Sequence, residues 1–235
     1  MSRPPRFSYA HAVHHATLRC NNREFLFSPP SLALFLAVLR EARAIFPLHL
    51  YNYCLMTNHV HLLLKVGRDD TLSRAMHWLG TSFVRRFNKA ADRKGHLWEG
   101  RFRSTLVEAE TAFFRCMAYV DLNPVRARMA TTPADYPWSA HAALRDEDTE
   151  QIALHELYLG LGADPASRYR AYLEVLASEA AREPLSLATA YFLGGPRFVG
   201  RMETRFAAGT SLRRRPLAGG LICVGPGHGG LRGPK

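Results

Sequence analysis

Two histidines, His59 and His61, lie one residue apart in a short apolar run, and this spacing suits metal binding. The run from Val60 to Leu64 follows two polar residues and precedes a glycine, which is typical of a strand. Side chains alternate between the faces of a strand, so both imidazoles are predicted to project from one face, roughly 6.6 Å apart along the backbone. Two neutral imidazoles on a rigid element can hold one divalent cation. The pair alone names no reaction, because a strand histidine is often only a hydrogen-bonded polar residue.

A tyrosine and an asparagine four residues apart, Tyr119 and Asn123, offer a nucleophile and a third ligand. Apolar residues at helical spacing from about Glu110 predict a helix that places both on one face. A phenol oxygen can attack phosphorus, and an amide oxygen can join two histidines on a hard cation. Pro124 disfavours helical geometry at Asn123, and Asn before Pro commonly starts a new helix. Asn123 is therefore a cap, a metal ligand, or both through different atoms.

Turn signals and apolar spacing predict the elements that hold these side chains. Strands are expected near residues 11–20, 48–56, 59–66 and 101–108, and helices near 29–45 and 71–92, followed by the tyrosine helix. This order predicts an α+β fold of the ferredoxin-like type, an antiparallel sheet with helices on one face. The histidine strand then lies inside the sheet, and the tyrosine helix packs across its polar face.

The charge of the chain favours a polyanionic partner. The formal net charge is +11 and the isoelectric point is near 10.0. Residues 85–103 hold seven Lys and Arg against two acids, which suits a groove that binds the phosphates of unpaired DNA. The expected DNA-binding residues are Arg85, Arg86, Lys89, Arg93, Lys94, Arg101, Arg103 and, beyond this segment, Arg126.

The C-terminal part differs in composition from the rest. Residues 145–183 hold nine acids and four basic residues, whereas from residue 197 onward eight Lys and Arg accompany one Glu. We therefore assign residues 1–145 to the catalytic domain and residues 146–235 to a helical appendage with a basic, partly disordered tail. Arg197, Arg201 and Arg205 recur at helical spacing, and the segment 213–215 leads into the Gly/Pro-rich end.

The remaining composition narrows the setting. The four cysteines are scattered without a C-x-x-C pair, so they predict no zinc site, and the start of the chain has no signal-peptide pattern. No apolar run approaches the length of a membrane span. A cytoplasmic protein without a membrane partner is the simplest expectation.

Three motifs in register resemble a known family. Residues 51–64, 95–103 and 119–126 read YNYCLMTNHVHLLL, GHLWEGRFR and YVDLNPVR, and residues 12–23 read AVHHATLRCNNR. Over roughly residues 8–145, the chain resembles the single-tyrosine HUH transposases, and within them the IS200-like and REP-associated (repetitive extragenic palindrome) branch.

This resemblance implies a metal-dependent strand transferase that acts on single-stranded, usually hairpin-marked DNA through a covalent 5′-phosphotyrosine. His59 and His61 match the metal-binding histidines of the family, Tyr119 matches the nucleophile, and Asn123 stands at the third ligand position. The expected cofactor is Mg²⁺ or Mn²⁺. A homodimer that supplies the tyrosine in trans and a monomer both agree with the sequence.

Two other classes of function remain open. A domesticated DNA- or RNA-binding protein without catalysis predicts that the Tyr119→Phe variant keeps every activity. A metallohydrolase that activates water predicts cleavage without a covalent adduct. The transposase is favoured because the nucleophile and the candidate ligands are all present at suitable spacing.

Overall fold

The computed structural model of the chain describes residues 6–21, 27–206 and 212–226. Two predicted features therefore lie outside the described residues. One is the end of the N-terminal motif, at Asn22 and Arg23, and the other is the Gly/Pro-rich segment 227–235.

Strands and helices follow one another through the first half of the chain in the predicted order. The strands are β1 (Val13–Arg19), β2 (Leu48–Leu55), β3 (His59–Val66) and β4 (Arg103–Val107). The helices are α1 (Pro29–Ile45), α2 (Thr71–Ala90) and α3 (Ala109–Asp121). Helix α1 begins after Ser28, whose side chain and backbone form a capping box with Ser31, and the prolines that follow suit the first helical turn.

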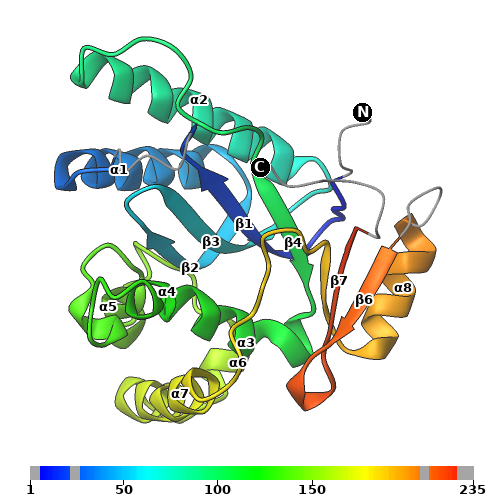
Figure 1. Cartoon of the computed structure of the whole chain (residues 1–235). Coiled ribbons are helices and arrows are strands. Elements are labelled where there is room, and N and C mark those ends of the chain that lie inside the picture. Colours follow the sequence, from blue (N-terminus) through cyan, green and yellow to red (C-terminus); the bar gives the residue numbers. More distant parts are fainter. Residues whose placement is uncertain (1–5, 22–26, 207–211, 227–235) are drawn as a thin grey trace.

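The strands form a sheet in the order β2-β3-β1-β4-β5-β7-β6 (Figure 1). Strand β1 is antiparallel to both neighbours and pairs Thr17 with His61 of β3 on one side and with Arg103 of β4 on the other. Residues that are paired across strands point to the same face. The register therefore brings polar side chains of three strands together on one face, with the histidine strand inside the sheet as predicted.

The two faces of the sheet are covered by different helices (Figure 1). Helices α1 and α2 lie on one side, where the predicted ferredoxin-like arrangement expects them. Helix α3 crosses the opposite face. The prediction that the helices lie on one face therefore holds for α1 and α2 but not for α3. The physical reason lies in β3: Val60 and Leu62 are fully buried on one face, while His61 points the other way and contacts Tyr119.

The C-terminal part corrects the prediction of a purely helical appendage. Its helices are α6 (Glu156–Leu159), α7 (Pro165–Ala180) and α8 (Pro196–Phe206), and they follow the short helices α4 (Asn123–Arg126) and α5 (His141–Arg145) of the first 145 residues. Its strands are β5 (Phe192–Gly194), β6 (Leu212–Pro216) and β7 (Ile222–Pro226). Strand β5 pairs in parallel with β4, so these strands extend the sheet of the first half of the chain.

The three consecutive arginines at 213–215 lie in β6, an edge strand, where the sequence predicts a helical appendage that leads into the tail. Short apolar stretches explain the difference, because Phe192, Leu193 and Val224 are fully buried where β5 and β7 meet. Charged residues on an edge strand also discourage pairing with another sheet.

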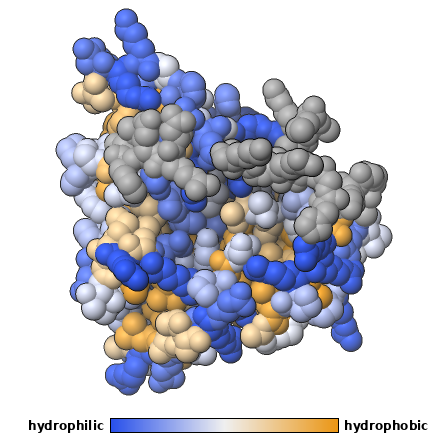
Figure 2. All heavy atoms as spheres, viewed as in Figure 1, coloured by the Kyte–Doolittle hydropathy of each residue, from blue (hydrophilic) through white to orange (hydrophobic). Residues whose placement is uncertain are grey.

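Hydrophilic and hydrophobic residues are interspersed on the face shown in Figure 2. Within the described residues, no helix combines the length and the hydropathy that a membrane crossing requires.

Candidate active site

The two histidines of β3 lie side by side on the face that α3 covers, as their spacing predicts. The ring centroids of His59 and His61 are 4.8 Å apart and their planes are nearly perpendicular. His61 is buried, with 3% of its surface exposed, and His59 is half-buried at the start of the strand. A ligand can therefore approach the pair from the side of His59, the more exposed of the two histidines.

Each imidazole contacts the protein through its Nδ1 atom. Nδ1 of His59 is 2.6 Å from Oδ1 of Asn58, and Nδ1 of His61 is 2.9 Å from Nε2 of His15. Nε2 of His61 is buried and has no hydrogen-bond partner among the described residues. A buried, unpartnered ring nitrogen is the atom that a cation would take, so the donor arrangement fits a metal ion.

The electrostatic surroundings keep the three imidazoles neutral at pH 7. Burial lowers the pKa of His15 to about 3, and burial with a contribution from Arg19 lowers the pKa of His59 to about 4. Burial lowers the pKa of His61 well below its usual range, and His15, His59 and Arg19 add to the effect. Neutral imidazoles are the form that binds metal ions.

Tyr119 meets the histidines from α3. Its ring is 5.4 Å from that of His15 and 5.6 Å from that of His61, and it is perpendicular to both. Burial raises the pKa of the Tyr119 hydroxyl, whereas Arg126 and Arg19 act in the opposite direction. The nucleophile and histidine pair predicted from separate motifs are thus brought together within one chain.

Asn123 begins α4, immediately after the tyrosine helix. Its Nδ2 donates a hydrogen bond of 2.6 Å to the backbone carbonyl of Tyr119. The amide nitrogen therefore ties the end of α3 to the start of α4. The predicted N-cap role is wrong, because Leu122 occupies the N-cap position and no side chain caps α4. The amide oxygen is the atom that a metal ligand would use, and this hydrogen bond does not involve it.

A metal ion at this site would depend on these few donors. Among the described residues, no three His, Cys, Asp or Glu side chains are grouped closely enough to hold a cation. Nε2 of His59, Nε2 of His61 and Oδ1 of Asn123 would supply two nitrogen ligands and one oxygen ligand, and DNA or water would supply the rest. Mg²⁺ commonly keeps several such exchangeable ligands, so this donor set is compatible with it.

Two residues near the site were missed by the sequence reasoning, His15 and Arg19. Both lie on β1, and its register places Arg19 opposite His59. The alternation of residues 15, 17 and 19 marks a polar face of the strand, which is the signal that could have indicated them. The register of β1 against β3 was not available from the sequence.

The predicted DNA-binding residues lie in four places. Arg85, Arg86 and Lys89 are on α2, and Arg93 and Lys94 are in the loop that follows it. Arg101 and Arg103 lie just before and at the start of β4, and Arg126 ends α4. Their side chains differ in what they already contact. Both terminal nitrogens of Arg86 donate to Glu41, whereas Arg103 donates one bond of 2.8 Å to the carbonyl of Ala188.

The aromatic residues of the same segment are part of the core. Trp98 is half-buried, packs against Phe83 and donates its ring N–H to the carbonyl of Gly80. Phe102 is buried. Phe102 therefore offers no exposed ring on which a base could stack.

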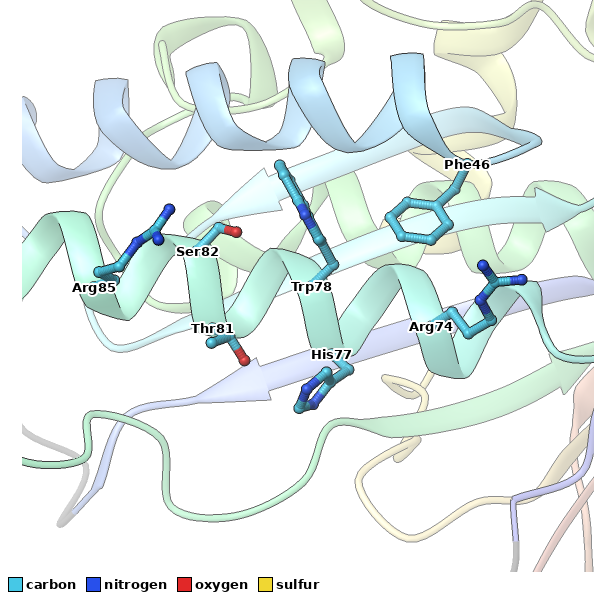
Figure 3. Close-up of a pocket in the computed structure, with 7 residues that line it drawn as sticks. All are labelled: Phe46, Arg74, His77, Trp78, Thr81, Ser82 and Arg85. Carbon is cyan, nitrogen blue, oxygen red and sulfur yellow. The ribbon is translucent and has the colours of Figure 1, made fainter.

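A surface pocket of about 440 Å³ lies apart from these residues (Figure 3). It is lined by Phe46, Arg74, His77, Trp78, Thr81, Ser82 and Arg85. Except for Phe46, these residues belong to α2, and Arg85 alone is among the predicted DNA-binding residues. The pocket includes neither the histidines of β3 nor Tyr119.

Comparisons with known proteins agree with the motifs and the geometry. The profile of the family described as "Transposase IS200 like" matches residues 8–123. A Haemophilus influenzae chain described as a REP-associated tyrosine transposase is 26% identical over 105 residues, covering 40% of this chain and 60% of that one.

Among solved structures, a REP-associated tyrosine transposase bound to a REP hairpin has a TM-score of 0.54 and 17% identity. The likeness covers 65% of this chain and 89% of that chain, and at this identity it shows the fold. Residues 8–123 of the chain thus match the IS200-like transposase family, as the three motifs predict. It spans 60% of the length of the Haemophilus relative.

Proposed function

We propose that the protein is a metal-dependent DNA strand transferase that cleaves and rejoins single-stranded, hairpin-marked DNA. The observation that carries the proposal is the contact of the Tyr119 ring with His61, whose Nε2 is buried and unpartnered among the described residues. The match to this family supports DNA transposition as the process. A nucleophile beside a pair of metal-ready imidazoles supports cleavage by the tyrosine itself.

The proposed reaction exchanges one phosphodiester for another. The phenol oxygen of Tyr119 attacks the scissile phosphorus, and the bond from phosphorus to the 3′-oxygen breaks. The phenol loses a proton and the departing 3′-oxygen gains one, which leaves a 5′-phosphotyrosine and a free 3′-hydroxyl. Attack by a 3′-hydroxyl on the phosphotyrosine reverses the step, so rejoining needs no nucleotide cofactor.

The residues around Tyr119 would have two roles, metal binding and stabilisation of negative charge. His59, His61 and Asn123 would hold Mg²⁺ or Mn²⁺, which when bound would polarise the phosphate and offset its developing charge. The raised pKa of Tyr119 means that its hydroxyl is protonated at pH 7, so it must lose its proton as it attacks. The positive charges of Arg19 and Arg126 favour the phenolate and would also attract the phosphate.

The cations on the surface would bind the DNA strand beyond the scissile phosphate. Arg103 lies on the face of the sheet that carries His61, two strands away and thus about 10 Å from it. The exposed Arg85 and Lys89 on α2 and Lys94 beyond it would contact more distant phosphates. A hairpin stem with a single-stranded flank has the extent that such separated contacts require.

The contacts of Tyr119 with His15 and His61 of its own sheet support a site formed within one chain. We therefore propose that the tyrosine acts in cis and that a homodimer, if present, is not needed to complete the site. Co-expression of Tyr119→Phe and His61→Ala chains tests this: cis action predicts no activity from the mixture, whereas restored cleavage would show action in trans.

A denaturing gel with labelled single-stranded hairpin DNA and Mn²⁺ tests the chemistry. The native protein should give a covalent protein–DNA adduct, and Tyr119→Phe should give none while it still binds the DNA. His61→Ala should also lose the adduct. Tyr191→Phe, which changes another half-buried tyrosine, is the matched control and should behave as the native protein does.

The alternatives predict other results on the same gel. Cleavage without an adduct that survives in Tyr119→Phe would indicate a metallohydrolase. Binding without any cleavage by the native protein, on every hairpin tested and with both cations, would indicate a DNA-binding protein that has lost catalysis.

A further inference from the structure

His15 is the hydrogen-bond partner of His61, whereas the other candidate metal ligand, His59, contacts Asn58. It lies in β1, 46 residues from His61 in the sequence, and it is buried with 2% of its surface exposed. We propose that His15 is a positioning residue, whose Nε2 accepts a hydrogen bond from Nδ1 of His61 and so keeps the Nε2 lone pair of His61 available for the cation. The proposal rests on the proposed function, because it takes His61 as a metal ligand.

The distance between the His15 and His61 rings limits which ring nitrogens can carry a proton. Nε2 of His15 and Nδ1 of His61 are 2.9 Å apart, a hydrogen-bond distance at which one proton lies between the two nitrogens. If His15 carried that proton, neutral His61 would carry its own on Nε2, where the described residues offer no acceptor. If His61 carries it, Nε2 of His61 is a bare lone pair, which is the form that binds a metal ion.

The same arrangement recurs at the other histidine. Nδ1 of His59 lies 2.6 Å from Oδ1 of Asn58, and a carbonyl oxygen can only accept. His59 therefore carries its proton on Nδ1 when that amide oxygen is the partner, and its Nε2 is the free nitrogen. With His15 as the acceptor for His61, both imidazoles use Nδ1 for the protein and present Nε2 to one ligand.

Packing holds the His15 ring in this position. The rings of His15 and His61 are nearly parallel, with centroids 5.1 Å apart, and the Tyr119 ring stands perpendicular to both. The register pairs His15 with Leu63 and His61 with Thr17, so the two histidines meet diagonally across the β1–β3 pair. A substitution of His15 would thus act on His61 through one hydrogen bond and one ring contact.

Variants of the full chain separate these two effects. His15→Phe keeps a ring and removes the acceptor, whereas the amide oxygen of His15→Gln can still accept from His61. His14→Phe is the matched control, since His14 is the adjacent buried histidine and its side chain points to the opposite face of β1. Mn²⁺ affinity is measured by electron paramagnetic resonance of free Mn²⁺, without DNA. We expect a 10- to 100-fold loss for His15→Phe, with most of the affinity retained in His15→Gln and His14→Phe.

A second measurement reads the proton directly. Two-bond ¹H–¹⁵N spectra of metal-free protein with labelled histidine should show His61 protonated on Nδ1 in the native protein and in His15→Gln. That tautomer should no longer be favoured in His15→Phe. A native His61 protonated on Nε2, or unchanged Mn²⁺ affinity in His15→Phe, would overturn the role of His15.

The Mn²⁺ affinity of His61→Ala shows whether the proposed function itself is wrong, separately from the role of His15. If His61→Ala binds Mn²⁺ as tightly as the native protein, the cation does not bind at this site and the proposed metal chemistry is wrong. If His15→Phe fails to fold, the native tautomer and the His15→Gln affinity still decide the proposal.

Discussion

His14 and His15 are consecutive buried histidines of β1 with different surroundings. His15 faces Tyr119 and His61, whereas the Nε2 atom of His14 is 3.2 Å from the Ser8 hydroxyl and its Nδ1 has no partner among the described residues. Burial lowers the pKa of His14 to about 3. Side chains that are buried in the neutral form make the folded state sensitive to acid, because the unfolded chain takes up protons that the folded chain does not.

His14 allows this sensitivity to be measured apart from the proposed metal site. Between its unfolded pKa of about 6.5 and its folded pKa of about 3, the unfolded state binds the extra proton, so stability falls as the pH falls. From pH 7 to pH 5 this one group should lower the unfolding free energy by about 2 kcal/mol. Urea unfolding of the native protein and of His14→Phe at pH 7 and pH 5 measures this loss of unfolding free energy. The native protein should lose about that much more stability than the variant, and equal losses would contradict the assignment.

The tyrosine helix α3 is fixed at its C-terminal end by a buried carboxylate. Asp121 is fully buried and accepts hydrogen bonds from Asn52 of β2 at 2.8 Å and from the Tyr172 hydroxyl of α7 at 2.7 Å. Nδ1 of His141 in α5 lies 3.0 Å from the same carboxylate. Four elements therefore meet two residues beyond Tyr119, and this network sets where the nucleophile stands relative to the sheet.

Removal of the Asp121 carboxylate should leave the buried donors Asn52 and Tyr172 without their hydrogen-bond acceptor. We expect Asp121→Ala to lower the unfolding free energy by about 3–5 kcal/mol, because buried polar groups that lose their partner keep the cost of desolvation. The control is Asp146→Ala, which removes an exposed partner of Arg145 and should leave the unfolding free energy nearly unchanged. Urea unfolding at pH 7 measures both. A loss below about 1 kcal/mol for Asp121→Ala would show that the network does not hold α3.

The molecule as a whole carries a surplus of positive charge, but its cations are not equivalent. The formal net charge is +11, yet Arg86 is paired with Glu41 and Arg214 with Glu203. An arginine whose guanidinium already meets a carboxylate would have to give up that partner to bind a phosphate. The exposed Arg85 and Lys89 on α2 are better placed to do so, and Arg85 also lines the pocket in Figure 3.

The salt dependence of DNA binding distinguishes these cations. For single-stranded DNA each phosphate contact adds about 0.7 to the slope of log K against log salt. The double variant Arg85→Gln and Lys89→Gln should therefore reduce the slope by about 1.4 if both residues contact phosphates. Arg86→Gln, on the same helix, should leave it nearly unchanged. Fluorescence anisotropy with a labelled hairpin, in a Tyr119→Phe background, measures both, and equal slopes for all variants would exclude α2 from the DNA interface.

Local patterns in the sequence were enough to determine several features. The alternation in β3 placed His59 and His61 on one face, and helical spacing placed Tyr119 of α3 one turn before Asn123 of α4. These features could be predicted because the period of a strand or helix is set by backbone geometry within a few residues. The family motifs then connected the three segments, and the contact of Tyr119 and His15 with His61 is what the structure adds.

Only the tertiary structure decided which residues meet across long separations. The contact of His15 with His61, the addition of β5 to β4 and the pairing of Arg86 with Glu41 each join residues 45 or more positions apart. The sequence around each partner is compatible with other neighbours, so no local pattern specifies these contacts. They follow from strand register and from burying as much apolar surface as the whole chain allows, which are properties of the complete packing and not of any one segment.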